Sequence, residues 1–143
     1  MPPGRVQVTF DCVDPSTLAT FWAAVLGYPP PDIHAVRAKL RALGTADEDL
    51  GNWCAVEDPS PSLDGTARPR LFFQRVPEPK VVKNRVHLDV AAPSDGPGDR
   101  RQQIDAEVRR VVQLGARELR SVTDDAGYFV VLQDPEGNEF CID

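Results

Sequence analysis

Two short stretches of the chain alternate apolar and polar residues, and both open with Arg-Val. The apolar positions of the first stretch are Val6, Val8, Phe10 and Cys12, and those of the second are Val86, Leu88 and Val90. The polar residues between them are Gln7, Thr9 and Asp11 in the first stretch, and Arg85, His87 and Asp89 in the second. A period of two predicts β-strands over residues 6–13 and 85–90, each with one buried face and one polar face.

Apolar residues at helical spacing predict three helices, each ended by a glycine. The first begins at Asp14-Pro15 and ends at Gly27, the second spans 32–44, and the third spans 99–115. Aspartate at the N-cap followed by proline is a typical helix start. The stripes expected to be buried are Leu18, Phe21, Trp22 and Val25; Ile33, Val36, Leu40 and Leu43; and Ile104, Val108, Val111 and Val112.

The remaining pattern predicts five further strands and a division into two modules. The strands are 52–56, 70–76, 117–122, 128–133 and 138–142, with a Pro/Ser/Gly-rich loop over 59–69 and a turn over 134–137. The aromatic content of 70–76 predicts burial on both of its faces. The second half then follows the order βαβββ, and the first half fits the same order with one helix inserted. We therefore expect an α+β protein of one domain, residues 1–143, with module 1 at 5–76, a proline-bounded linker at 77–83 and module 2 at 84–143.

Composition narrows the classes of partner. The 143 residues carry a formal net charge of −6, which disfavours a nucleic acid or an anionic membrane surface as the partner and leaves small molecules or other proteins. No apolar run approaches the roughly 20 residues of a membrane span, and the first residues lack the apolar core of a signal peptide. The three cysteines, Cys12, Cys54 and Cys141, cannot all pair, which fits a reducing compartment. These observations predict a cytoplasmic protein, and Cys12 and Cys54 are expected to be buried thiols.

Polar side chains recur on one face of the first strand of each module and of the last strand. They are Gln7, Thr9 and Asp11, then His87 and Asp89, then Glu139 and Cys141. If helices cover the apolar faces, these polar groups converge in one cavity between the modules, where a ligand site is expected. Burial without a ligand, metal or water would cost about 1–3 kcal/mol for each unsatisfied group.

Three motifs together resemble the vicinal oxygen chelate superfamily, which includes glyoxalase I, extradiol dioxygenases, fosfomycin-resistance transferases and bleomycin-resistance proteins. The motifs are the opening strand and helix with Phe21-Trp22 and Leu26-Gly27, the repeated module, and the closing segment 134–140. Residues 72–77 and 83–89 resemble more narrowly the glyoxalase-like proteins common in actinobacteria. The resemblance covers residues 5–142 and implies the glyoxalase/bleomycin resistance fold: two βαβββ modules whose curved mixed sheet forms a cup with helices outside.

The resemblance also implies a divalent metal site. Its first-strand ligand positions fall on Gln7 and His87, and its last-strand position, usually glutamate, falls on Cys141, with Glu139 two residues earlier on the same face. One zinc, nickel, manganese or iron ion would fit this superfamily, and a Cys141 thiolate would favour zinc. The alternative is a metal-free site in which His87 is hydrogen-bonded to Asp89 or Glu139. The sequence leaves both arrangements open.

The resemblance implies two functions of different class. One is a glyoxalase-like lyase or isomerase acting on a compound with neighbouring oxygens, with Glu139 or Asp89 as general base. The other is a metal-free protein that binds an aromatic or antibiotic-like ligand, so the sequence leaves open whether the chain is an enzyme. Candidate ligand-binding residues are Asp11, Trp53, Gln74, Arg75 and Arg85, although Trp53 could equally pack in the core and the arginines could pair with carboxylates. The resemblance further implies a homodimer.

Overall fold

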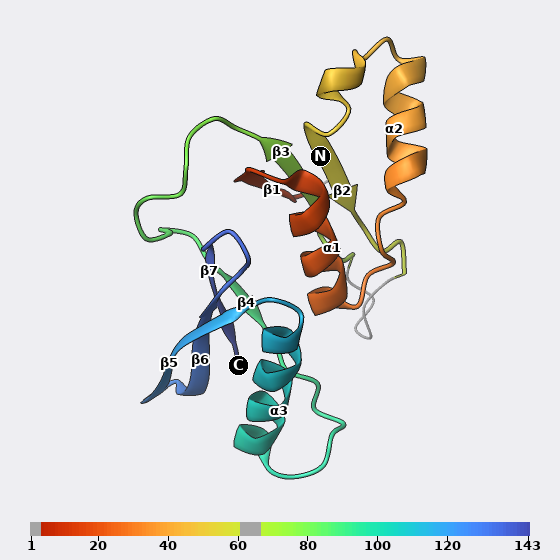
Figure 1. Cartoon of the computed structure of the whole chain (residues 1–143). Coiled ribbons are helices and arrows are strands. Elements are labelled where there is room, and N and C mark those ends of the chain that lie inside the picture. Colours follow the sequence, from red (N-terminus) through yellow and green to blue (C-terminus); the bar gives the residue numbers. More distant parts are fainter. Residues whose placement is uncertain (1–3, 61–66) are drawn as a thin grey trace. The chain divides into compact units, whose positions relative to one another are not determined.

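The computed structural model describes residues 4–60 and 67–143, so part of the predicted 59–69 loop, residues 61–66, lies outside the described residues. The chain forms two compact units, Met1–Pro79 and Lys80–Asp143, whose boundary falls inside the predicted linker. Each unit holds a small mixed sheet with at least one helix, so the predicted α+β class is confirmed (Figure 1).

The N-terminal unit contains three strands among its described residues. Its elements are β1 (Gln7–Cys12), α1 (Pro15–Leu26), α2 (Ile33–Ala42), the short 3₁₀ helix η1 (Asp47–Asp49), β2 (Trp53–Val56) and β3 (Arg70–Arg75). The sheet order is β1-β3-β2, with β1 parallel and β2 antiparallel to β3. This unit therefore shows one strand fewer than a complete βαβββ module.

Helix α1 begins and ends at the predicted residues. The Asp14 carboxylate accepts a hydrogen bond from the Thr17 backbone N–H at 3.1 Å, which satisfies one of the free donors of the first turn. Gly27 ends the helix at a φ of 66°, a left-handed conformation that glycine adopts without a Cβ penalty.

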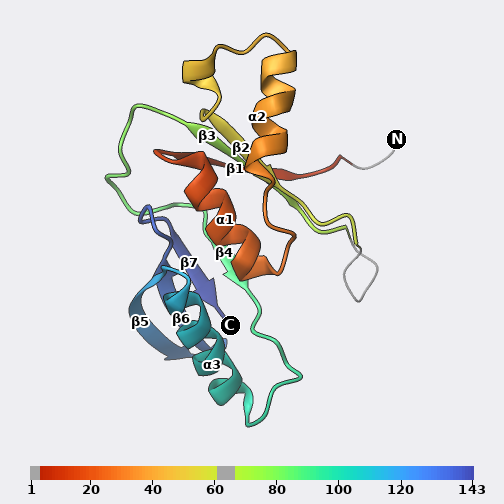
Figure 2. The same cartoon turned by 45° about the vertical axis from the view of Figure 1, so that its right-hand side comes forward.

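The core of the N-terminal unit lies between α1 and one face of its sheet, where α1 crosses the strands (Figure 2). The Phe10 ring lies 5.3 Å from the Trp22 ring and 5.1 Å from the Phe73 ring, measured between centroids. Trp22 and Phe73 are buried, and so are Cys12 and Cys54, as predicted. The prediction that β3 is buried on both faces is wrong, because Phe72 and Gln74 on its other face are partly exposed.

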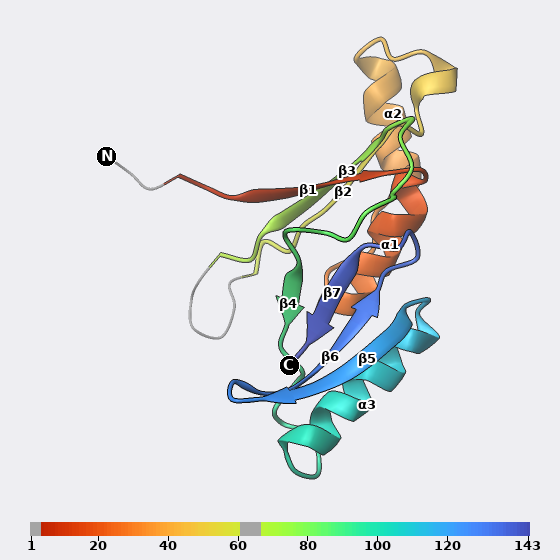
Figure 3. The ribbon, with the colours of Figure 1, turned by 90° about the vertical axis from the view of Figure 1, so that its left-hand side faces the viewer.

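The C-terminal unit has the complete βαβββ order. Its elements are β4 (Leu88–Val90), α3 (Arg100–Gln113), β5 (Arg117–Asp124), β6 (Gly127–Gln133) and β7 (Glu139–Ile142). The sheet order is β4-β7-β6-β5, with β4 parallel to β7 and the other pairs antiparallel. Helix α3 covers one face of this sheet, as Figure 3 shows. In both units, the first strand thus pairs in parallel with the last.

The strand predicted over 85–90 begins only at Leu88, and Val86, expected to be buried, is 82% exposed. The parallel register pairs Leu88 with Phe140, and β7 itself begins at Glu139. A longer β4 would therefore have no partner strand for its first residues. Val6 is exposed for a related reason, because β1 begins at Gln7 opposite the first residue of β3.

Two predicted helix stripes differ from the observed ones. Helix α2 buries none of its residues, and Leu43 beyond its end is largely exposed. On α3, Val112 is exposed, whereas Glu107 is buried beside Ile104 and carries an ion pair with Arg110 at 2.6 Å. Glu107 lies one turn from Ile104 and next to the buried Val111, whereas Val112 lies on the other edge of the buried stripe. The Arg110 partner makes the buried carboxylate of Glu107 tolerable. No helix in the described ranges is long and apolar enough to cross a membrane.

Candidate functional site

Three potential metal-binding side chains of the C-terminal unit meet at the β4–β7 pair. Asp89 and Cys141 are register partners in these parallel strands, so their side chains project side by side from one face. His87 lies one residue before β4, and its Nε2 is 3.2 Å from Asp89 Oδ1. One donor atom from each of His87, Asp89 and Cys141 lies within 4.8 Å of the others. We call these three residues the donor group.

The donor group has a buried side and an exposed side. Cys141 is 8% exposed, whereas the side chains of His87 and Asp89 are 44% and 57% exposed. Burial, followed by the charge of Asp89 and a hydrogen bond to it, raises the pKa of the Cys141 thiol to about 11. Asp89 thus contacts both the thiol and the imidazole. Because the negative charge of Asp89 disfavours the thiolate, the surroundings of Cys141 differ from the electropositive ones that activate a nucleophilic cysteine.

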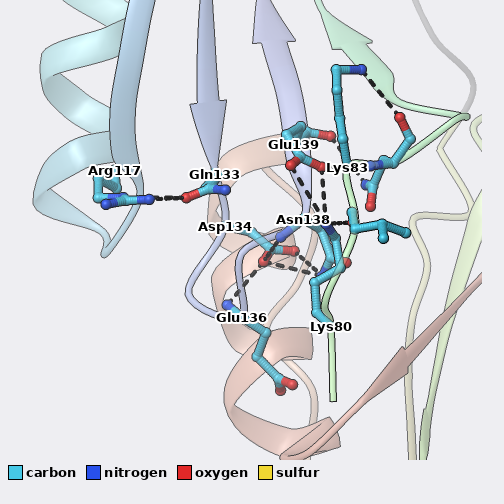
Figure 4. Close-up of polar contacts among 10 residues, drawn as sticks. Lys80, Lys83, Arg117, Gln133, Asp134, Glu136, Asn138 and Glu139 are labelled. Carbon is cyan, nitrogen blue, oxygen red and sulfur yellow. Dashed lines mark hydrogen bonds and ion pairs between the residues drawn. The ribbon is translucent and has the colours of Figure 1, made fainter. Parts of the chain in front are cut away.

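Glu139 lies outside the donor group and holds the segment that leads to His87. Its carboxylate accepts a hydrogen bond from the Asn84 backbone N–H at 2.9 Å and lies 3.3 Å from Lys80 Nζ (Figure 4). Burial alone would raise the pKa of the Glu139 carboxyl, but the backbone N–H of Asn84 and the Lys80 ammonium outweigh it and lower the pKa to about 2. Glu139 is therefore ionised and doubly engaged at neutral pH.

The predicted turn before β7 is closed by a buried aspartate. Asp134 Oδ1 accepts hydrogen bonds from the backbone N–H of Glu136 at 2.9 Å and of Asn138 at 3.0 Å. Gly137 adopts a φ of 86°, which the turn requires. This turn fixes the residue at which β7 begins, and therefore the face to which Glu139 and Cys141 belong.

The candidate residues of the N-terminal unit lie on its own sheet. On the face away from α1, Gln74 Nε2 donates to Asp11 Oδ1 at 2.7 Å, and Trp53 is the register partner of Gln74 on β2. Gln7 lies on the same face, where its side-chain oxygen accepts a hydrogen bond from Arg70. Trp53 is partly exposed and not in the core.

The two candidate arginines do not belong to this group of polar side chains on the N-terminal sheet. Arg75 belongs to the next position of β3 and donates through Nε to the Val13 carbonyl at 3.1 Å. Arg85 is exposed in the bend before β4 of the C-terminal unit. The structure therefore groups Asp11, Gln74 and Trp53, and gives Arg75 a backbone partner.

Lys80 and Asn84 are the residues that the sequence did not indicate. Both lie in or next to the predicted linker, and their partner Glu139 is more than fifty positions away. A lone lysine among prolines gives no signal of a distant carboxylate.

Solved structures similar to this chain support the fold. A glyoxalase/bleomycin resistance protein/dioxygenase family enzyme from Burkholderia phytofirmans PsJN has a TM-score of 0.60 and 15% identity, over 95% of this chain and 94% of that one. A mutant of the fosfomycin resistance protein FosX from Listeria monocytogenes, complexed with Mn(II) and 1S,2S-dihydroxypropylphosphonic acid, has a TM-score of 0.64 and 11% identity, over 99% and 92%. The oxidase ChaP-H1 has a TM-score of 0.53 and 16% identity, over 99% and 94%.

Family membership follows from the sequence model. The comparison with curated proteins found no match. The narrower resemblance to actinobacterial proteins stays a prediction. The model of the glyoxalase-like domain matches residues 7–142, nearly the whole chain. The chain therefore belongs to the glyoxalase-like domain family, within the vicinal oxygen chelate superfamily that the sequence motifs indicated.

Proposed function

We propose that this protein is a small-molecule enzyme of the glyoxalase-like lyase or isomerase type, using one divalent metal ion to act on a substrate with two neighbouring oxygens. The convergence of the donor group on one face of the β4–β7 pair carries the proposal. The Mn(II) and the vicinal diol in the similar FosX structure support it.

The residues present fit such an ion. Imidazole nitrogen, carboxylate oxygen and thiolate sulfur are all ordinary ligands of divalent transition metals. When bound, the ion would supply a Lewis acid for the substrate oxygens. His87 and Asp89 are half-exposed, so the outer side of the donor group is the side that a substrate can reach.

Asp89 is the better candidate for the general base. A general base needs a lone pair that is free to accept the proton of the substrate. The pKa of Glu139 is lowered to about 2, and its oxygens are engaged by Asn84 and Lys80, which makes it a weak base. We therefore assign Glu139 the task of positioning the segment before His87.

The polar residues of the N-terminal unit remain candidates for ligand binding. Gln7 falls on a ligand position of the family resemblance, and its side-chain oxygen accepts a hydrogen bond from Arg70. Trp53 and the Asp11–Gln74 pair offer an aromatic surface beside hydrogen-bonding groups, which suits a planar substrate with polar edges. Arg75 and Arg85 remain candidates for an anionic substrate.

A second candidate function is metal-free ligand binding. The His87–Asp89 contact and the raised pKa of the Cys141 thiol favour it, because the donor group can satisfy its own hydrogen bonds without an ion. In that function the chain would sequester an aromatic or antibiotic-like compound.

Elemental analysis of protein purified without chelator separates the two candidates. The enzyme proposal expects about one divalent ion per chain, which His87→Ala removes. A metal-free protein that keeps binding ligand after His87→Ala would support the second candidate instead. A thermal-shift screen of dicarbonyls, catechols and antibiotics would then identify the ligand class.

We also propose a cytoplasmic homodimer. The three cysteines cannot all pair with one another, which supports the reducing compartment, and the family supports the dimer. Light scattering after size exclusion should give twice the 15.7 kDa of one chain, and a mass of one chain would refute the dimer.

A further inference from the structure

We propose that the donor group is a thiolate-containing site selective for zinc-like ions, which binds zinc or cobalt(II) through Cys141 in preference to manganese or magnesium. The inference rests on the proposed function and narrows it, because it names the class of ion and makes Asp89 the third ligand in place of the general base. It depends on the lateral juxtaposition of Asp89 and Cys141 on β4 and β7, with His87 beside them.

The distances fit a small tetrahedral site. With metal–ligand bonds of about 2.0–2.3 Å, two ligands of a tetrahedral ion are about 3.3–3.8 Å apart. His87 Nε2 and Asp89 Oδ1 are already 3.2 Å apart, and all three donor atoms lie within 4.8 Å of one another. Closing the group on an ion therefore needs movements of about 1 Å or less, which side-chain rotation supplies.

The backbone holds two of the three ligands in a fixed relation. Immediately after the paired residues, the Asp143 N–H donates to the Val90 carbonyl at 3.2 Å, and the Ala92 N–H donates to the Asp143 carbonyl at 2.7 Å. The ladder between β4 and β7 thus continues past Asp89 and Cys141. Preorganised ligands lose little freedom on binding, which favours a tight site.

The third ligand, His87, is restrained through the segment that precedes it. The Glu139 carboxylate, on the same strand as Cys141, binds the Asn84 backbone N–H three residues before His87. This contact ties the approach to His87 to β7. The strand β7 therefore supplies one ligand and restrains the chain that supplies another.

The chemistry of the three donors selects the ion. Binding converts the Cys141 thiol to a thiolate and releases its proton to solvent. The thiolate and the Asp89 carboxylate then balance the two charges of the ion, and His87 binds as neutral imidazole. Soft sulfur and nitrogen donors suit zinc and cobalt(II), whereas magnesium and manganese prefer oxygen. Three protein ligands with an exposed outer side match a site that keeps one position open.

Cobalt(II) titration of chelator-treated full-length protein tests the inference spectroscopically. A thiolate-to-cobalt charge-transfer band in the near ultraviolet should appear at one equivalent, together with intense visible bands of tetrahedral cobalt. Zinc should displace cobalt completely, and a hundredfold excess of manganese or magnesium should not. Cys141→Ser should abolish the charge-transfer band. Asp89→Asn should weaken cobalt binding by roughly tenfold to a hundredfold.

Cys12→Ser is the matched control, because Cys12 is also buried but lies in the other unit, and the spectrum of this variant should equal that of the wild type. Circular dichroism establishes that each variant is folded, and Cys141→Ala replaces Cys141→Ser if the serine variant fails to fold. Cobalt or manganese binding without a charge-transfer band overturns the inference but leaves a metal-dependent function intact. Failure of zinc, cobalt and manganese to bind overturns both.

Discussion

The contacts of Glu139 with Asn84 and Lys80 form a clamp that joins β7 to the segment before β4. Replacing Glu139 by glutamine removes the negative charge from this clamp. The glutamine oxygen can still accept the hydrogen bond from the Asn84 N–H, so the shape of the contact survives. What is lost is the charge on the acceptor and the ion pair with Lys80. The substitution therefore isolates the electrostatic part of the clamp.

The expected loss of stability follows from these two contacts. A hydrogen bond to a charged group contributes about 1.5–3 kcal/mol, and one to a neutral group about 0.5–1.5 kcal/mol, so the difference is about 1 kcal/mol. An ion pair with a partly exposed lysine adds about 0.2–1 kcal/mol. The Glu139→Gln variant should thus lose about 1–2 kcal/mol at pH 7, which lowers Tm by roughly 3–8 °C for a chain of this size.

The loss should depend on pH in one direction. The clamp lowers the pKa of Glu139 from 4.5 to about 2, so the folded state binds its proton less readily than the unfolded state. The charge therefore stabilises the fold fully above the unfolded pKa, and this contribution disappears as the pH falls through the folded pKa. The stability difference between wild type and variant should narrow steadily between about pH 5 and pH 2.

Urea denaturation followed by circular dichroism at several pH values between 7 and 3 measures the difference directly. Glu118→Gln is the control, because Glu118 is exposed on β5 and its loss should change stability by less than about 0.5 kcal/mol. A Glu139→Gln variant as stable as the wild type at pH 7, or a stability difference that does not narrow in acid, would refute the clamp.

Three further substitutions test the candidate site, the N-cap of α1 and the core of the C-terminal unit. His87→Ala should remove the bound metal, measured by elemental analysis, while lowering the free energy of unfolding by no more than about 1–2 kcal/mol, because the side chain is half-exposed; a larger loss would mark His87 as structural. Asp14→Ala should cost about 1 kcal/mol in urea denaturation through loss of the N-cap to α1, and Asp14→Asn should recover most of it. Phe140→Ala, at a completely buried position, should cost about 3–5 kcal/mol, and a loss below 1 kcal/mol would show that β7 is not part of the core.

Local chemistry explains why most elements were predictable. The Asp14 side chain caps the start of α1, and the left-handed backbone of Gly27 ends it. The alternation over residues 128–133 matches β6. Errors arose where a partner strand decides the outcome. Val86 has the pattern of a strand residue, but β4 begins only where β7 can pair with it. Val112 is apolar, yet the position facing the sheet of the C-terminal unit belongs to Glu107.

The sequence placed His87, Asp89, Glu139 and Cys141 in one predicted cavity but did not indicate which of them come into contact. Alternation placed His87 and Asp89 on one face, which their 3.2 Å contact agrees with. Their relation to Cys141 depends on the register between two strands about fifty residues apart, which no local pattern encodes. For the same reason, the sequence could not show that Glu139 is engaged by Lys80 and Asn84.

The parallel pairing of β4 with β7 has a consequence for how the C-terminal unit folds. Parallel strands cannot be joined by a tight turn, and here α3, β5 and β6 lie between the two strands along the chain. Bringing such distant residues together costs loop-closure entropy, which makes this pairing a slow kind of contact to form. An ion that binds the donor group would stabilise only states in which β4 and β7 are paired, and would thereby favour the folded unit over the unfolded chain.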